Sequence, residues 1–186
     1  MRIFGVDPGS ARTGYGCIET SGSNHRIVVC GALSVQVRLP FPEKLMSLHV
    51  RLAELITRHK PDAVAVEDLF HAKNARSALK LGHVRGIVLL AASQAGVPVA
   101  EYTPTQVKRA VVGYGRAAKH QVQEMVTLLL GLEERPSPLD VSDALAVAIC
   151  HAHLQGAVQN EIVENDSSSP KIRSWRQYRP EGPGES

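Results

Sequence analysis

The sequence has little of the residues that build several common classes of protein. It holds only three cysteines, far apart and without C-x-x-C spacing, which argues against a disulfide framework or a zinc site. Aromatic residues make up 4% of the chain, too few for a groove that stacks many unpaired bases. No apolar run approaches the ~18 residues of a membrane span, and the N-terminus shows no secretory signal. We therefore expect reduced thiols and a cytoplasmic protein with no membrane partner.

The remaining composition is typical of an ordinary globular protein. The chain has 186 residues, of which 44% are apolar and 21% are charged. This composition excludes a wholly disordered chain, and the length is too small for a two-lobed ATPase or kinase. From about residue 157 onward the sequence turns to Asn, Ser, Pro, Gly and charged residues. We therefore predict one domain over residues 1–156 and a flexible C-terminal tail over residues 157–186.

Hydrophobic periodicity and turn residues predict an α/β fold. Short apolar runs bounded by turn residues predict strands, and apolar residues spaced three and four apart predict amphipathic helices. The expected strands cover residues 2–7, 15–19, 26–37, 63–66 and 97–102, and the expected helices cover residues 43–60, 74–94, 105–111, 119–130 and 139–154. The first three strands suggest an antiparallel meander. The order of the elements predicts a five-stranded mixed sheet flanked by helices.

Four carboxylates stand where the surrounding sequence is apolar. Asp7 and Glu67 end strands that look central, and Asp140 and Asp143 lie three residues apart at the start of the last helix. Simpler explanations exist, because Asp7 could form an Asx turn and Asp140 could belong to a helix capping box. If the four converge, a multivalent cation is needed to keep all of them ionised. An all-oxygen ligand set favours Mg²⁺ or Mn²⁺ and can hold two ions.

The glycine-rich segment from Asp7 to Gly16 suggests a different function. It resembles the phosphate-gripping first hairpin of the actin, sugar-kinase and chaperone ATPase superfamily, in which glycines let the backbone approach an anion. The chain has no obvious second loop of this kind, and it has no length for a second lobe. An ATP-binding protein is therefore an alternative.

Basic charge is concentrated in residues 71–120. This window holds eight Lys and Arg residues and a single acid, Glu101, so its net charge is +7 while the rest of the chain totals −4. Part of the excess recurs at three- and four-residue spacing in one stripe: Lys73, Arg76, Lys80 and His83. A solvated helix face and a phosphate-binding surface both explain such a stripe. Phe70, just before it, could be a core residue or a wedge between opened base pairs.

A set of motifs in fixed order carries a resemblance to a known family. The motifs are Gly5-Val6-Asp7-Pro8-Gly9-Ser10 with Thr13-Gly14-Tyr15-Gly16, Ala72-Lys73-Asn74-Ala75 to Ser77-Ala78-Leu79-Lys80-Leu81-Gly82, Thr103-Pro104-Thr105-Gln106-Val107-Lys108, and Asp140 to Ala148. They span roughly residues 1–155 and resemble the RuvC family of bacterial Holliday junction resolvases. The resemblance implies an RNase H-like fold, a homodimer, and Mg²⁺-dependent paired nicking of symmetric strands in a four-way DNA junction, during recombination and repair. It also implies work beside a branch-migration motor.

The same resemblance assigns roles to individual residues. The expected metal ligands and catalytic acids, called the acid quartet below, are Asp7, Glu67, Asp140 and Asp143, which would hold two Mg²⁺ ions. Lys108 and Lys119 match basic positions associated with catalysis or DNA contact. Together with the basic window, the resemblance gives the full set of expected DNA-binding residues: Phe70, Lys73, Asn74, Arg76, Lys80, Lys108, Arg109, Arg116 and Lys119. Asp68 is an additional acid beside the quartet. A catalytically inactive junction-binding module is a further alternative, against which the complete quartet argues.

Overall fold

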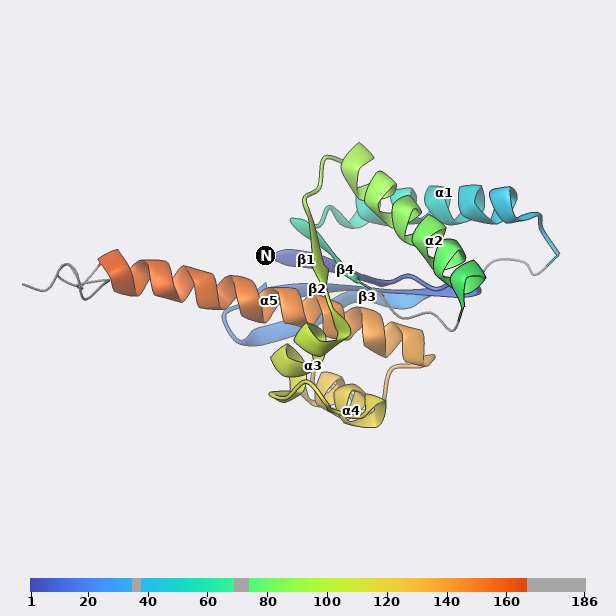
Figure 1. The fold of residues 1–186 in the computed structure, drawn as a ribbon. Helices are drawn as coiled ribbons and strands as arrows, with labels where there is room; N and C mark the ends of the chain where they lie inside the picture. The colour runs from blue at the N-terminus through green and yellow to red at the C-terminus, as the bar shows by residue number, and fades with distance from the viewer. Residues whose placement is uncertain (35–37, 69–73, 167–186) are drawn as a thin grey trace, which may run out of the picture.

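The computed structural model describes residues 1–34, 38–68 and 74–166, which form a sheet with helices on both faces (Figure 1). The strands are β1 (Arg2–Asp7), β2 (Arg12–Ser21), β3 (Asn24–Ser34), β4 (Ala63–Glu67) and β5 (Val99–Tyr102). The helices are α1 (Phe41–His59), α2 (Ala75–Gln94), α3 (Pro104–Val112), α4 (Lys119–Leu129) and α5 (Leu139–Asp166). Each strand and helix expected from the sequence is therefore present.

The five strands form one mixed sheet in the order β3-β2-β1-β4-β5. β1 pairs antiparallel with β2, and β2 with β3, as the meander predicts. On the other side, β1 pairs parallel with β4, and β4 with β5. β1 and β4 are thus central, parallel neighbours, and their last residues, Asp7 and Glu67, lie at the same end of the sheet. The expected α/β fold with a five-stranded mixed sheet is confirmed.

Each face of the sheet buries its own apolar core. α1 and α2 cover one face, where they pack over Phe4, Val6 and Val66. α5 runs along the other face, and α3 and α4 pack against it (Figure 1). Because α5 lies between the sheet and these two helices, its residues Ala144 to Cys150 are all buried. Asp143, the residue just before this stretch, is therefore held between the sheet and these two helices.

The glycine-rich segment contributes more to the sheet than the sequence predicts. β2 begins at Arg12 rather than at residue 15, and its pairing with β1 extends as far as the Gly14–Asp7 pair. Thr13 is buried, and its hydroxyl donates to the Gly9 carbonyl at 3.1 Å. This bond closes the turn between β1 and β2. The segment is therefore a hydrogen-bonded hairpin that supports Asp7.

α5 is longer than expected. It extends through Asp166, whereas the periodicity predicted an end at Leu154. Between Pro138 and Pro170 the sequence contains no proline that would stop the helix. The domain boundary at residue 156 and the flexibility of residues 157–186 stay predictions. Despite the length of α5, no helix in the described part of the chain is apolar over enough residues to cross a membrane.

Candidate active site

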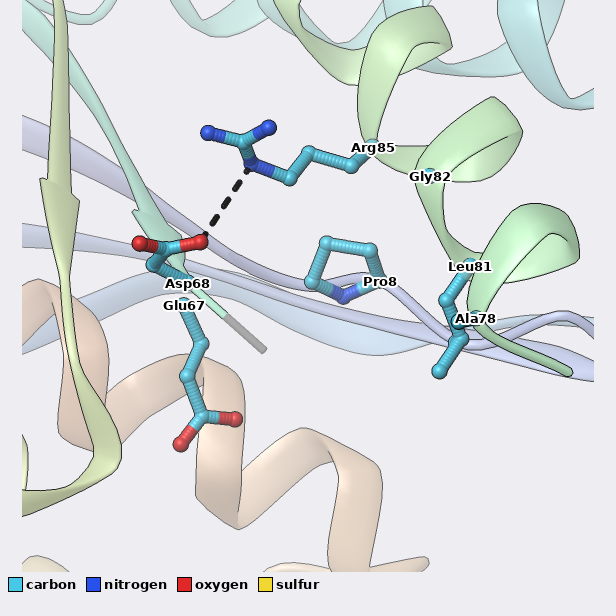
Figure 2. Close-up of a pocket in the computed structure, with 7 residues that line it drawn as sticks. All are labelled: Pro8, Glu67, Asp68, Ala78, Leu81, Gly82 and Arg85. Atoms are coloured by element: carbon cyan, nitrogen blue, oxygen red, sulfur yellow. Dashed lines mark ion pairs between the residues drawn. The ribbon is translucent and has the colours of Figure 1, made fainter. Parts of the chain in front are cut away.

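The alternation of side chains along β1 and β4 directs two acids to the face that α5 covers. In β1, Val6 packs beneath α1 and α2, whereas Ile3 packs on the α5 side. Asp7 follows Ile3 by four positions and therefore shares its face. In β4, Ala65 packs on the α5 side, so Glu67 points the same way. Figure 2 shows the Glu67 carboxylate directed toward the ribbon of α5.

Two glycines let the first turns of α5 approach the sheet closely. Gly14 pairs with Asp7, and a Cβ atom at Gly14 would collide with the carbonyl oxygen of Asp140. A Cβ atom at Gly5 would collide with the backbone of α5 one turn further on. Any other residue would force helix and sheet apart, because only glycine lacks the Cβ. The close approach brings Asp140 and Asp143 next to the end of β1.

The acid quartet converges closely enough for its carboxylates to perturb one another. Burial, together with the nearby carboxylates of Glu67, Asp143 and Asp140, raises the pKa of Asp7 from 3.8 to about 8. Burial and the charge of Asp143 raise the pKa of Glu67 from 4.5 to about 7, against the opposing effect of two lysines. Each raised pKa indicates a carboxylate whose charge is poorly compensated. Such a cluster at the end of a sheet favours binding of a cation.

Two basic side chains from distant segments compensate part of this charge. Lys119, at the start of α4, places its Nζ 3.0 Å from Oδ2 of Asp143. The hydrogen bond to Asp143 raises the pKa of Lys119. Arg12, at the start of β2, lies 3.5 Å from Oδ2 of Asp140. Sequence reasoning missed Arg12, because no local pattern connects it with Asp140.

The donor set of the quartet fits a hard divalent cation. All four expected ligands are carboxylates, the groups that Mg²⁺ and Mn²⁺ prefer. Within residues 1–34, 38–68 and 74–166, no three His, Cys, Asp or Glu side chains are arranged so that they could hold a metal ion as they stand. Asp140 and Asp143 are each paired with a protein cation instead. The raised pKa of Asp7 shows that its ionised form is disfavoured, and a metal ion would compensate that charge.

A pocket of about 170 Å³ opens beside the quartet. It is lined by two of the acids, both expected lysines, and apolar side chains of α3, α4 and α5: Glu67, Asp143, Lys108, Lys119, Pro104, Val107, Val122 and Ala146. A capping box between Thr103 and Gln106 fixes the start of α3, the helix that carries Lys108. The structure therefore places Lys108 and Lys119 in one pocket with two of the acids. Their chemical roles stay predictions.

Four other expected DNA-binding residues that carry positive charge lie outside this pocket. Arg76 and Lys80 are exposed on the first turns of α2. Arg109 is exposed near the end of α3, and Arg116 is exposed in the loop that follows. α2 and α3 lie on opposite sides of the sheet (Figure 1). The basic window therefore supplies positive charge from helices on both faces of the sheet.

Asn74 has a structural role that the sequence analysis did not assign. Its side-chain oxygen accepts a hydrogen bond from the backbone N–H of Ser77 at 2.9 Å, so Asn74 caps the N-terminus of α2. This bond orients the turn from which Arg76 projects. Phe70 and Lys73, also expected to contact DNA, lie outside the described residues.

Asp68 does not face the quartet. Figure 2 shows the side chains of Glu67 and Asp68 leaving the chain in opposite directions. Asp68 faces Arg85 of α2, with 3.8 Å between Oδ1 and Nε. This additional acid therefore belongs to the side of the sheet that α2 covers.

Comparison of the sequence with known families gives one match over most of its length. The family described as "Crossover junction endodeoxyribonuclease RuvC" matches residues 3–151. A relative of that name from Pelotomaculum thermopropionicum is 54% identical over 153 residues, which cover 82% of this chain and 93% of the relative. Another, from Pelobacter propionicus, is 49% identical over 182 residues, which cover 97% of this chain and 100% of the relative.

A solved structure agrees with the sequence match. Thermus thermophilus RuvC in complex with Holliday junction substrate superposes with a TM-score of 0.82 at 38% identity, over 85% of this chain and 96% of that one. The agreement supports the expected RNase H-like fold and argues against the actin-like ATP-binding alternative. By sequence and by fold, this chain belongs to the RuvC family of crossover junction endodeoxyribonucleases.

Proposed function

We propose that this RuvC family member resolves Holliday junctions by paired, symmetric nicking of the DNA, in recombination and repair. The observation that carries the proposal is the convergence of Asp7, Glu67, Asp140 and Asp143 at one end of the sheet. Family membership gives the reaction class, that of an endodeoxyribonuclease. The related Thermus thermophilus RuvC has been solved in complex with Holliday junction substrate, which supports a four-way junction as the DNA partner.

The quartet would hold two Mg²⁺ ions, for which Mn²⁺ would substitute. Its oxygen-only donor set and the uncompensated charge on Asp7 support this choice of metal. When bound, such ions supply Lewis-acid chemistry that makes a water nucleophilic and stabilises the departing oxygen. Asp7 and Glu67 would contribute ligands from the sheet, and Asp140 and Asp143 from α5.

The basic residues of the pocket would bind and orient the scissile phosphate. Lys119 and Lys108 place positive charge beside Glu67 and Asp143, where a phosphate would enter. Both could contact its non-bridging oxygens and stabilise the negative charge that develops as water attacks the phosphorus. The new bond joins water oxygen to phosphorus, and the bond from phosphorus to the 3′ oxygen breaks. The products are therefore a 5′-phosphate and a 3′-hydroxyl.

DNA binding would use basic residues from both faces of the sheet. The proposed contacts are Phe70, Lys73, Asn74, Arg76, Lys80, Lys108, Arg109, Arg116 and Lys119. Arginine and lysine would pair with phosphates of the junction arms, which makes binding depend on salt. Phe70 would act as a wedge between base pairs at the opened centre of the junction.

Two symmetric nicks require two active sites, so we include a homodimer in the proposal. A two-fold axis would relate the sites in the same way as it relates the strands that they cut. Large apolar side chains exposed on α1 and α2 are available for such an interface: Met46, Val50, Leu79 and Leu90. Work beside a branch-migration motor, in the cytoplasm, belongs to the same proposal.

A cleavage assay on a synthetic four-way junction tests the function. Wild-type protein with Mg²⁺ should nick two opposing strands, and Asp7→Asn should bind the junction without cutting it. Glu133→Gln, a matched change of an exposed acid in the loop between α4 and α5, should cut at the wild-type rate. Normal cleavage by Asp7→Asn would show that the metal-site assignment is wrong. Binding without cleavage by the wild type would favour the inactive junction-binding module.

A further inference from the structure

Two acids at the ends of β4 and β5 are not part of the proposed metal site, and both contact the same arginine. Asp68 directly follows Glu67, and Glu101 is the single acid in the basic window of residues 71–120. Arg85 of α2 forms an ion pair with each of them: its Nε lies 3.8 Å from Oδ1 of Asp68, and its terminal nitrogen contacts Oε2 of Glu101. Arg85 therefore connects α2 to the ends of β4 and β5.

This connection acts on the residue next to a proposed metal ligand. The backbone N–H of Asp68 donates to the Tyr102 carbonyl at 2.8 Å, which ties the end of β4 to β5. Figure 2 shows Asp68 directed toward Arg85 and Glu67 directed toward α5. The two residues share a planar peptide bond. Contacts that restrain the backbone of Asp68 therefore also restrain the Cα atom of Glu67, from which its side chain extends.

Beyond the buried Val66, the end of β4 borders open space on the α2 side. A pocket of about 150 Å³ lies there, and Figure 2 shows its lining: Pro8, Glu67, Asp68, Ala78, Leu81, Gly82 and Arg85. The Nε atom of Arg85 is buried, and in the described structure it has no hydrogen-bond partner. On this side, the charges that meet across the pocket therefore add to the backbone bond between Asp68 and Tyr102 in holding the end of β4.

We propose that Arg85 is a positioning residue for Glu67. By pairing with Asp68 and Glu101, it fixes the end of β4 and, through it, the carboxylate that this strand contributes to the quartet. The inference rests on the proposed function, because it takes Glu67 as a metal ligand. It also links α2, the helix that carries the exposed Lys80, directly to the active site.

The affinity of the DNA-free protein for Mn²⁺, measured by electron paramagnetic resonance, tests this inference without a cleavage readout. Arg85→Met removes the charge and both ion pairs but keeps a long side chain. If Arg85 positions Glu67, Arg85→Met should bind Mn²⁺ about tenfold more weakly, which is the lower end of the range for residues that orient metal ligands. If Arg85 acts only through its charge, Arg85→Met should bind Mn²⁺ more tightly, because a positive charge that repels the divalent cation has been removed. The sign of the change separates the two.

Matched variants complete the test. Lys80→Met removes the same charge from the same helix and should not weaken Mn²⁺ binding. Arg85→Lys keeps the charge, but a single ammonium group cannot pair with both acids as the guanidinium does, so it should weaken binding in part. The inference is overturned if Arg85→Met binds Mn²⁺ as tightly as the wild type or more tightly. If thermal melting shows that Arg85→Met is unfolded, Arg85→Lys takes its place. Wild-type or tighter Mn²⁺ binding by Arg85→Lys then overturns the inference. If Asp7→Asn binds Mn²⁺ as the wild type does, the proposed function itself fails.

Discussion

The ammonium nitrogen of Lys119 lies 3.0 Å from Oδ2 of Asp143, so a basic residue of α4 pairs with an acid of α5 inside the proposed active site. The lysine side chain is 70% exposed and the aspartate only 20%, so Lys119 reaches from the surface into the quartet. There its charge opposes the rise in the pKa of Asp7 and of Glu67. Lys119 is well placed to neutralise the protein's own acids and a phosphate of the substrate.

We expect Lys119→Met to slow cleavage much more than it weakens junction binding. The variant loses a positive charge next to the scissile phosphate, and removal of one such stabilising donor costs a factor of about 100 or more. Single-turnover cleavage at saturating protein measures the rate separately from affinity. Lys119→Arg, which keeps the charge, should retain part of the activity. Cleavage by Lys119→Met at the wild-type rate would exclude Lys119 from the chemistry.

The raised pKa of Asp7 predicts that the metal-free protein loses stability as the pH rises. Asp7 has a pKa of about 8 in the folded protein and an ordinary value of 3.8, so folding favours its protonated form. Its contribution is fully present below pH 4 and is lost as the pH rises through about 8. Glu67, with a pKa of about 7, acts in the same direction.

Urea unfolding in EDTA at pH 5 and pH 8.5 measures this loss. We expect the free energy of unfolding of the wild type to fall, relative to Asp7→Asn, by at least about 1.4 kcal/mol, the equivalent of one pKa unit. At pH 8.5, Asp7→Asn should therefore be the more stable protein. Mg²⁺ should stabilise the wild type more than the variant. Parallel pH profiles for the two proteins would contradict the burial of charge at Asp7.

Gly14→Ala should damage both the fold and the site. The added Cβ collides with the carbonyl of Asp140, so the first turn of α5 must move away from the sheet. We expect a loss of about 1–3 kcal/mol, the usual cost of an overpacked core, and a strong loss of cleavage. Gly156→Ala, in the same helix, meets no atom within 4 Å and should stabilise the protein by up to about 1 kcal/mol. Thermal unfolding and junction cleavage of both variants measure the difference.

Replacement of Lys108 by alanine should change the salt dependence of junction binding. If Lys108 contacts one phosphate, the slope of log affinity against log salt concentration should decrease by about one. Fluorescence anisotropy with a labelled junction at several salt concentrations, in the absence of Mg²⁺, gives the slope. Arg58→Ala, on the exposed side of α1, should leave it unchanged. A wild-type slope for Lys108→Ala would leave Lys108 with a catalytic or structural role only.

The elements of this fold could be predicted because each has a strong local pattern. The leucines of α1, for example, lie on one stripe, and Leu48 and Leu52 are both buried as the spacing requires. The predicted start of a strand was wrong where pairing with a segment distant in the sequence determines it. β2 starts at Arg12 because it pairs with Ser34 of β3, a partner that no local pattern around residues 12–15 reveals.

The acids of the candidate site could be predicted from the sequence, but the basic residues that pair with acids in and beside it could not. Asp7 and Glu67 could be recognised because burying an acid at the end of an apolar strand costs free energy unless a partner compensates its charge. The pairing of Arg12 with Asp140 and of Arg85 with Asp68 joins segments far apart in the chain. Such contacts depend on how α2 and α5 are placed on the sheet, which periodicity does not specify.

The quartet is distributed over the whole length of the folded chain, and this distribution limits when the enzyme can be active. Two of its acids come from β1 and β4, and the other two from α5, the last described helix. During synthesis the chain grows from its N-terminus, so the sheet can form before α5 has left the ribosome. Until α5 lies against Gly5 and Gly14, half of the proposed metal ligands are missing. If the quartet is the metal site, a nascent or partly folded chain therefore cannot yet cleave DNA.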